Sequence, residues 1–239
     1  MRPVALVTGA SRRLGRAFAE GAARAGHDIA VHYRSDPAAA GEVADALAAL
    51  GAAAASFPAD LREPGAPRRL VESVLARFGR LDLLLHSASP WLEKAVEEVT
   101  EPDWDDVFSV GPRAGFFLAQ AAAPALARSG GSILLVSDVA ATKAWPRHVP
   151  HAAAKAAVEA LVRNLAVALG PGVRVNAVAP GVVLPPDDLP AAEVARLVER
   201  TPLARAVAVE DLVSAALFLA ANQSVTGQVL AVDAGRSVV

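Results

Sequence analysis

The chain has 239 residues, of which 54% are hydrophobic and 20% charged, and its formal net charge is −2 at pH 7. This balance excludes a disordered, collagen-like or coiled-coil chain, and the near-neutral charge gives no reason to expect nucleic acid or an anionic membrane as a partner. The absence of cysteine excludes a disulfide scaffold, a thiolate metal site and a cysteine nucleophile. No segment has the pattern of a signal peptide or a membrane span, so we expect a soluble, cytoplasmic protein.

Short apolar runs alternate with segments of helical period along the whole chain. In chain order, the pattern predicts a strand at 4–7, a helix at 14–25, a strand at 28–32, a helix at 37–50, a strand at 53–58, a helix at 64–78 and a strand at 81–85. It continues with a long helix at 101–127, a strand at 132–136, a helix at 148–169, a strand at 173–179, a small helical segment at 187–200, a helix at 209–221 and a strand at 229–232. Gly26, Gly51 and Gly79 end the first three helices.

Seven strands with intervening helices and short connections indicate βαβ units in one sheet. The predicted fold class is therefore α/β: a single doubly wound (Rossmann) domain over residues 1–239, with a seven-stranded parallel sheet and helices on both faces. Within it, residues 185–205 are predicted to form a small insertion that serves as a substrate loop. Ligands of such sheets bind outside the carboxyl ends of the strands, which is where the functional residues are expected.

A glycine turn, Thr8-Gly9-Ala10-Ser11-Arg12-Arg13-Leu14-Gly15, follows the first strand and opens a helix. Backbone N–H groups at a helix N-terminus suit a phosphate, but the spacing is not G-x-G-x-x-G, and an ordinary loop remains an alternative. The second strand ends in His32-Tyr33-Arg34-Ser35, where enzymes that prefer NAD usually place an acid. Arg34 and Arg13 can bind a 2′-phosphate, or they are solvated loop residues. The pattern favours NADPH over NADH.

These residues resemble the short-chain dehydrogenase/reductase family, and more narrowly its pteridine reductase branch. Arg13-Leu14-Gly15 stands in place of the usual Gly-Ile-Gly, and the motif after strand two is similar to His-Tyr-x-Arg-Ser but one residue shorter. Asp60-Leu61 matches the family's adenine-contacting position, and His86-Ser87-Ala88-Ser89 stands where the family has Asn-Asn-Ala-Gly or Asn-Asn-Ala-Ser. The segments Arg174-Val175-Asn176-Ala177-Val178-Ala179-Pro180-Gly181 and Val232-Asp233-Ala234-Gly235 extend the resemblance over essentially the whole chain.

The resemblance implies a set of functional residues and a homotetramer. Cofactor-binding positions are Gly9, Ser11, Arg12, Arg13, Leu14, Gly15, His32, Tyr33, Arg34, Ser35, Asp60, Leu61, Ser87, Ala88, Ser89, Lys155, Pro180, Gly181 and Val182. Substrate-binding positions are Arg13, Ser89, Trp91 and Asp138; Trp91 takes the place of an aromatic ring that pteridine reductases set against the pterin, although it can also be a core or interface residue.

The catalytic positions depart from the family pattern. The Tyr-x-x-x-Lys pair is His151 and Lys155, the serine position is Asp138, and the asparagine expected after Trp104 is Gly111. Aspartate at the serine position is itself a pteridine reductase trait, whereas the changes at His151 and Gly111 are not explained by that branch. Asp138, His151 and Lys155 are the catalytic candidates.

His151 and Lys155 share one helix face, since they are four residues apart. The ammonium of Lys155 disfavours an imidazolium at His151, while a carboxylate at Asp138 favours it. Three hypotheses stay open: an NADPH-dependent reductase of a pterin-like heterocycle, which leads because an imine nitrogen is more basic than a carbonyl oxygen; a carbonyl reductase that works through His151; and a cofactor-binding protein that has lost turnover. We expect no metal, because the histidines lie on different elements without matching carboxylates.

Overall fold

The computed structural model describes residues 2–185 and 189–239. Its seven strands form one parallel sheet in the order β3-β2-β1-β4-β5-β6-β7. The strands are β1 (Val4–Thr8), β2 (Asp28–Tyr33), β3 (Ala54–Pro58), β4 (Leu83–His86), β5 (Ser132–Val136), β6 (Arg174–Pro180) and β7 (Val229–Val232). The direction of strand order reverses between β1 and β4, and such a switch point is where doubly wound sheets open a crevice for ligands.

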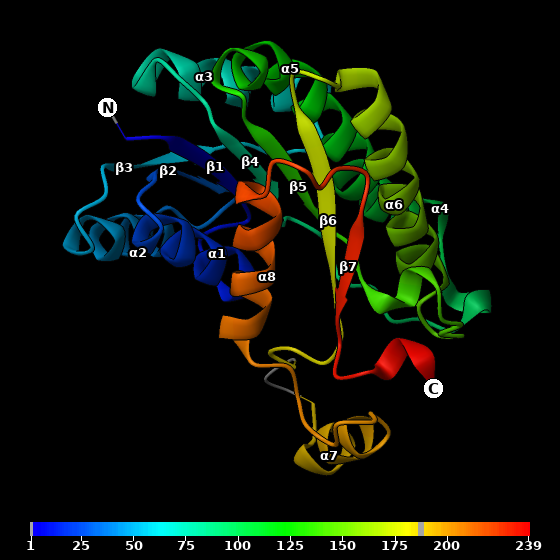
Figure 1. The fold of residues 1–239 in the computed structure, drawn as a ribbon. Helices are drawn as coiled ribbons and strands as arrows, with labels where there is room; N and C mark the ends of the chain where they lie inside the picture. Colours follow the sequence, from blue (N-terminus) through cyan, green and yellow to red (C-terminus); the bar gives the residue numbers. More distant parts are fainter. Residues whose placement is uncertain (1, 186–188) are drawn as a thin grey trace.

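Helices cover both faces of the sheet (Figure 1). One layer holds α1 (Arg13–Arg24), α2 (Pro37–Ala49) and α8 (Val209–Ala221), and the other holds α3 (Ala66–Phe78), α4 (Glu101–Phe108), α5 (Ala114–Ser129) and α6 (Val149–Leu169). The helix α7 (Ala191–Glu199) lies apart, beyond the carboxyl end of β6 and close to the C-terminus of the chain. The single α/β domain with a seven-stranded parallel sheet is confirmed.

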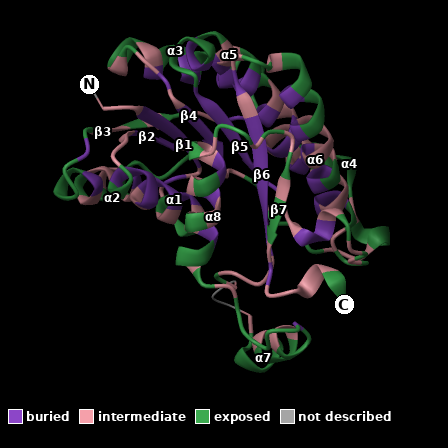
Figure 2. Cartoon of the chain, in the orientation of Figure 1, coloured by how far each residue is buried: buried purple, intermediate pink, exposed green. Residues whose placement is uncertain are grey.

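The core consists of two apolar clusters, one on each side of the sheet. The residues of β1, β4 and β5 are buried along their full length (Figure 2), because they are covered from both faces. This is why these strands read as continuous apolar runs in the sequence rather than as alternating patterns. A rigid sheet centre then leaves the loops at its carboxyl edge to carry polar side chains.

The long helix predicted at 101–127 differs from the structure in its middle. Its first turn is capped by Thr100, whose hydroxyl accepts a hydrogen bond from the Asp103 N–H, but Ser109–Arg113 then form one π-helical turn before α5 begins. Pro112 has no N–H to donate, and Gly111 has a low helix propensity, so the regular α-helical ladder is interrupted there. The hydrophobic periodicity of the sequence continues through this interruption and therefore did not predict it.

Other boundaries shift by a few residues. The third helix begins at Ala66 rather than at 64, and the strand predicted at 81–85 runs from Leu83 to His86. The helical segment predicted at 187–200 is observed as α7, while 186–188, within the predicted substrate loop 185–205, lie outside the described residues. In the described part of the chain, no helix combines the length and the apolar character needed to cross a membrane.

Candidate active site

The turn between β1 and α1 is packed too closely for side chains at two positions. A Cβ on Gly15 would overlap the carbonyl oxygen of Gly9, and one on Gly9, whose φ is +66°, would lie 3.1 Å from the Cα of Ala88. Helix α1 begins with no side-chain cap and no acidic residue in its first turn. Its open N–H groups and positive dipole end fit the pyrophosphate of a dinucleotide.

His32 supports this turn from inside the protein. Its Nδ1 accepts a hydrogen bond from the Gly9 N–H (3.1 Å), and its Nε2 donates to the carbonyl oxygen of Ala59 (3.0 Å). A carbonyl oxygen only accepts, so Nε2 carries a proton; Nδ1 accepts from an N–H, so it carries none. The ring is therefore neutral. Burial lowers the pKa of His32 to about 4. Both ring nitrogens are therefore used to fix the glycine turn against the end of β3.

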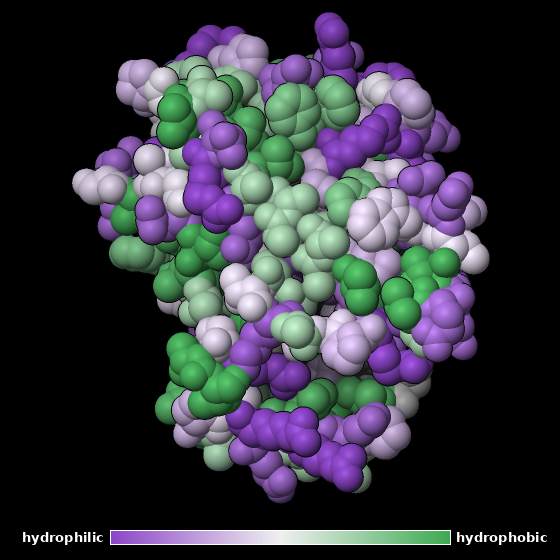
Figure 3. Space-filling view, turned by 90° about the vertical axis from the view of Figure 1, so that its right-hand side faces the viewer, coloured by the Kyte–Doolittle hydropathy of each residue, from purple (hydrophilic) through white to green (hydrophobic). Residues whose placement is uncertain are grey.

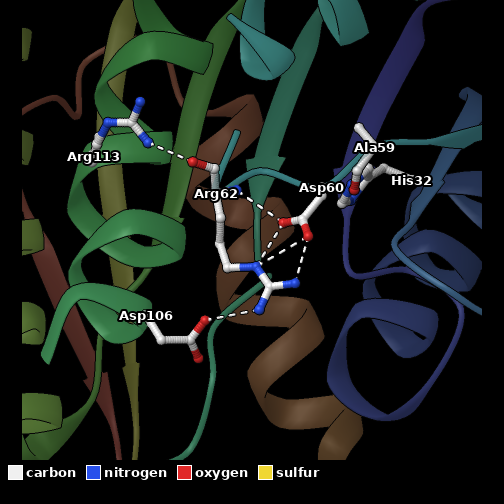
Figure 4. A network of polar contacts seen from close by, with 6 residues as sticks. All are labelled: His32, Ala59, Asp60, Arg62, Asp106 and Arg113. Atoms are coloured by element: carbon white, nitrogen blue, oxygen red, sulfur yellow. Dashed lines mark hydrogen bonds and ion pairs between the residues drawn. The ribbon is translucent and has the colours of Figure 1, made fainter. Parts of the chain in front are cut away.

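The residues expected at the adenine end of the cofactor lie at the ends of β2 and β3. Arg34 and Ser35 are exposed, and Arg34 forms no ion pair with any residue that the structure describes. Asp60 accepts hydrogen bonds from Arg62, with Nε 2.9 Å from Oδ1, and these bonds lower the pKa of Asp60 to about 2. Arg62 also donates to Asp106 of α4 at 3.2 Å (Figure 4), which connects the loop between β3 and α3 to α4.

Sequence reasoning missed the role of His86, which is 4% exposed. Its Nε2 donates to the carbonyl oxygens of Val110 (3.0 Å) and Gly111 (3.2 Å), and its Nδ1 lies 2.8 Å from the Thr8 hydroxyl. That hydroxyl in turn accepts from the N–H groups of Ser87 and Ala88, each at 3.1 Å. Burial lowers the pKa of His86 to about 4. The neutral ring therefore joins β1, β4 and the π-helical turn at the switch point.

The remaining predicted cofactor positions are distributed around the same edge. Ser11 and Leu14 are half-buried, Arg12 is exposed, Tyr33 is half-buried and Leu61 is buried, while Ser89 is exposed in the loop after β4. Pro180, Gly181 and Val182 follow β6, where Gly181 donates to the Val232 carbonyl oxygen (3.0 Å). The guanidinium of Arg13 donates to the carbonyl oxygen of Leu184, so it reaches from the glycine turn to the loop after β6.

The three catalytic candidates lie close together: Asp138 just after β5, and His151 and Lys155 in the first two turns of α6. The Nε2 of His151 lies 3.7 Å from Oδ2 of Asp138, and the other carboxylate oxygen accepts a hydrogen bond from the Ala140 N–H (2.8 Å). Lys155 is 6% exposed, and its ammonium donates to the carbonyl oxygen of Val136 (2.9 Å). Burial lowers the pKa of Lys155 to about 8, and the carboxylate of Asp138 acts in the opposite direction.

His151 is 3% exposed, and neither of its ring nitrogens has a hydrogen-bond partner among the described residues. Buried polar atoms are nearly always paired in folded proteins, so this ring has donor and acceptor capacity that is available to a bound molecule. Gly111 lies at the missing asparagine position in the π-helical turn. A Cβ there would be in ordinary contact with Ala154 at 4.0 Å. The packing around Gly111 therefore leaves room for a Cβ, and glycine is not required at this position for steric reasons.

Aromatic rings surround His151. The ring of Trp91, which is 51% exposed, lies 4.8 Å from the rings of both His148 and His151, measured between centroids. Trp145, which sequence reasoning also missed, lies 5.3 Å from His148 and 6.3 Å from Trp91. We call these four residues the aromatic wall. In the described residues, no group of three or more histidine or acidic side chains is arranged to hold a metal ion.

Comparisons with known proteins agree with this geometry. The sequence model of one protein family, described as "Enoyl-(Acyl carrier protein) reductase", matches residues 9–237. Together with its fold, this match shows that the chain belongs to the short-chain dehydrogenase/reductase family, whose members bind a nicotinamide cofactor. The cradle around Gly9 and Gly15 fits such a cofactor, since close backbone approach and open N–H groups are what a pyrophosphate requires.

Individual relatives carry different names. The "Hydroxynaphthalene reductase-like protein Arp2" of Metarhizium majus is 42% identical over 182 residues, covering 75% of this chain and 68% of the relative. The "L-rhamnose 1-dehydrogenase (NAD(P)(+))" of Sphingomonas sp. is 35% identical over 242 residues, 98% of this chain and 95% of the relative. The solved "FolM Alternative dihydrofolate reductase 1" from Brucella canis, complexed with NADP, has a TM-score of 0.93 and 31% identity, covering 99% of this chain and 94% of that one.

Proposed function

We propose that this protein is an NADPH-dependent reductase of a flat, fused-ring heterocycle, with a pterin or dihydropterin as the substrate class. The observation that carries the proposal is the half-exposed ring of Trp91 beside the buried, unpartnered ring of His151, close to the carboxylate of Asp138. An aromatic face next to a few polar groups suits a planar substrate that both stacks and forms hydrogen bonds. The Brucella canis relative, named as an alternative dihydrofolate reductase, supports this class.

The choice of NADPH depends on the end of β2. Arg34 lies exposed there with no described ion-pair partner, and the first acid that follows, Asp36, caps α2 by accepting from the Ala39 N–H at 2.9 Å. A free guanidinium attracts a 2′-phosphate, and the carboxylate that would bind a ribose 2′-hydroxyl is engaged in the helix cap. The NADP in the Brucella canis structure supports the same preference.

Delivery of a proton to the substrate is the step for which this site departs most from the family pattern. The nicotinamide supplies a hydride when it is bound, and a proton must reach the reduced heteroatom from a side chain or water. The ammonium of Lys155 is hydrogen-bonded to the Val136 carbonyl oxygen, so the polar side chains next to a bound ring are the carboxylate of Asp138 and the imidazole of His151, 3.7 Å apart. A substrate nitrogen that is itself basic needs a weaker donor than a ketone oxygen, and Asp138 can hold that nitrogen by a charge-assisted hydrogen bond.

A second candidate function is the reduction of a flat ketone, with His151 as proton donor. The nitrogens of His151 favour it: neither has a hydrogen-bond partner in the described parts of the chain, so this buried imidazole can bond a substrate oxygen. The name of the Metarhizium relative supports an aromatic ketone in this role.

The test is NADPH oxidation with 7,8-dihydropterin and with 2-tetralone, in the wild type and in Asp138→Ala and His151→Ala variants. Asp45→Asn and His27→Ala serve as matched controls, because the first is exposed on α2 and the second lies at the opposite edge of the sheet. We expect Asp138→Ala to lower kcat/KM for dihydropterin by ~30-fold to ~1,000-fold, equivalent to ~2–4 kcal/mol of transition-state stabilisation.

His151→Ala should retain measurable dihydropterin reduction, since water can protonate the imine nitrogen, and His151→Tyr should raise the rate on 2-tetralone. If His151→Ala abolishes turnover while Asp138→Ala is mild, the ketone reductase replaces the pterin reductase. Firm NADPH binding without reduction of either substrate would instead support a cofactor-binding protein that has lost turnover.

A further inference from the structure

The segment that follows β7 is held in a defined turn. Asp233, which is 8% exposed, accepts hydrogen bonds from the N–H groups of Gly235 (2.9 Å) and Ser237 (2.6 Å). Ala234 and Gly235 both have positive φ values, +56° and +84°, which reverse the chain at the end of the sheet. The turn leads into a short 3₁₀-helix, Arg236–Val238, so the direction of the Arg236 side chain is set by the backbone before it.

That turn brings Arg236 to the aromatic wall. Its guanidinium carbon lies 5.1 Å from the centroid of the Trp145 ring. The two residues are therefore neighbours in space although they are far apart in the sequence. Among the described residues, the guanidinium makes one long hydrogen bond, 3.4 Å from Nη1 to the Leu197 carbonyl oxygen, and no ion pair. A guanidinium has five N–H donors, so most of this group's capacity is open.

The guanidinium of Arg236 is half-buried and lies in a mixed electrostatic environment. Burial lowers the pKa of Arg236, the carboxylate of Asp138 raises it, Arg200 lowers it and Asp233 raises it. Within the described parts of the chain, no carboxylate comes close enough to Arg236 to form an ion pair. A partly buried cation without a direct counter-ion can receive an anionic group from a ligand.

The same region holds the unpartnered buried nitrogens. Nε2 of His148 and both ring nitrogens of His151 lack hydrogen-bond partners in the described structure. Aromatic faces, buried nitrogens without a hydrogen-bond partner among the described residues and a guanidinium with open donors therefore lie next to one another. One ligand satisfies all of them if it is planar, polar along one edge and negatively charged at another.

We propose that Arg236 forms an anion-recognition subsite at the edge of the aromatic wall, and that the substrate is a flat ring system bearing a carboxylate or a comparably acidic group on the edge facing Trp145. This inference rests on the proposed function for the ring itself. It adds that the acidic group, not the ring alone, determines which compound of this class is selected, because a guanidinium fork matches a carboxylate in geometry as well as in charge.

The experiment compares matched ligands by isothermal titration calorimetry in the presence of saturating NADP⁺. The pairs are pterin with 6-carboxypterin, and 2-naphthol with 6-hydroxy-2-naphthoic acid, which differ by one carboxylate. We expect the wild type to bind the carboxylated member at least about tenfold more tightly, as a charge-assisted hydrogen bond predicts, and the difference to shrink as KCl is raised. Arg236→Met should reduce the ratio to below about twofold without weakening the uncarboxylated ligand, and Arg236→Lys should retain part of it.

Arg128→Met is the matched control for net charge. Arg128 is exposed in the last turn of α5, which runs into β5 from the amino-terminal edge of the sheet, so its removal should leave the ratio unchanged. A ratio near one in the wild type overturns the subsite, and so does an Arg236→Met variant that weakens both members of a pair equally, because that result assigns Arg236 to holding the C-terminal turn.

The two ligand pairs separate this inference from the proposed function. If only the naphthalene pair binds, and with the expected ratio, the pterin assignment fails and the subsite stands. If the pterin pair binds with a ratio near one, the pterin assignment stands and the subsite fails. If none of the four ligands binds to the NADP⁺ complex, the aromatic wall does not accept flat rings, and both are overturned.

Discussion

Two buried histidines predict that this protein loses stability in mild acid. His32 and His86 are 2% and 4% exposed, and each uses both ring nitrogens as a neutral imidazole. Burial lowers the pKa of each to about 4 in the folded protein, from an ordinary value of 6.5. Between these two values the unfolded chain binds protons that the folded protein does not, so stability is fully present above pH 6.5 and falls as the pH falls toward 4.

The size of the loss follows from these values. At pH 5 an unfolded histidine is almost fully protonated and the buried one is not, which costs about 2 kcal/mol for each residue relative to pH 8. The two together give about 4 kcal/mol, a large part of the roughly 5–15 kcal/mol that stabilises a domain. The hydrogen-bonded carboxyl groups of Asp60 and Asp103, with pKa values of about 2, titrate below this window and do not contribute.

The assay is urea unfolding followed by circular dichroism at pH values from 8 to 4.5, at constant protein concentration. We expect His32 and His86 together to make the free energy of unfolding decrease by about 2.4 kcal/mol per pH unit near pH 5, and each of His32→Asn and His86→Asn to lower the observed slope by about 1.2. The slope is the readout because either substitution also lowers stability at every pH. His27→Gln is the comparison variant: burial lowers the pKa of this half-buried ring too, so the substitution should change the slope in the same direction but by less.

A free energy of unfolding that stays constant between pH 7 and pH 5 would refute the reasoning. So would a His86→Asn variant with an unaltered slope, since the ring would then be protonated, or exposed, in the native state. Either result would also remove the argument that a neutral His86 joins Thr8 to the π-helical turn.

Further predictions concern the cofactor and the assembly. NADPH should bind at least ten times more tightly than NADH, and Arg34→Ala should remove much of the difference by weakening NADPH binding by ~1.5–3 kcal/mol, measured by calorimetry; equal wild-type affinities would contradict the assignment. Gly15→Ala should abolish NADPH binding, because its Cβ has no room, whereas Gly41→Ala on α2 meets no atom within 4 Å and should bind normally by fluorescence titration. We also predict a homotetramer, which the family resemblance implies and which the small side chains of the alanine-rich helices α5 and α6 would allow. A groove of about 660 Å³, lined in part by Phe116 and Leu161, lies beside these helices, and hydrophobic side chains reach the surface on the face shown in Figure 3; light scattering that gives a single 24.5 kDa species would refute the prediction.

The architecture can be predicted from the sequence alone, and the candidate site residues can be placed along it. Strands buried on both faces must be apolar throughout, so they appear as short apolar runs, and glycines and helical periods mark what lies between them. The turn from Thr8 to Gly15 and the pair His151 and Lys155 are local patterns, and their place in the fold follows once the order of the elements is known. These features depend on neighbours within one or two turns of chain.

The roles of other residues depend on long-range contacts, which appear only in the folded structure. His86 reads as one departure from a motif, and its function depends on Thr8 from β1 and on carbonyl oxygens of the π-helical turn. No sequence pattern links Arg236 to Trp145. They meet because β7 pairs with β6 and β6 with β5, so the segment after β7 comes close to the loop after β5, which carries Trp145. Hydrogen bonds and charge pairs of this kind are set by strand order and by the burial of each group, and neither quantity is written in the local spacing of residues.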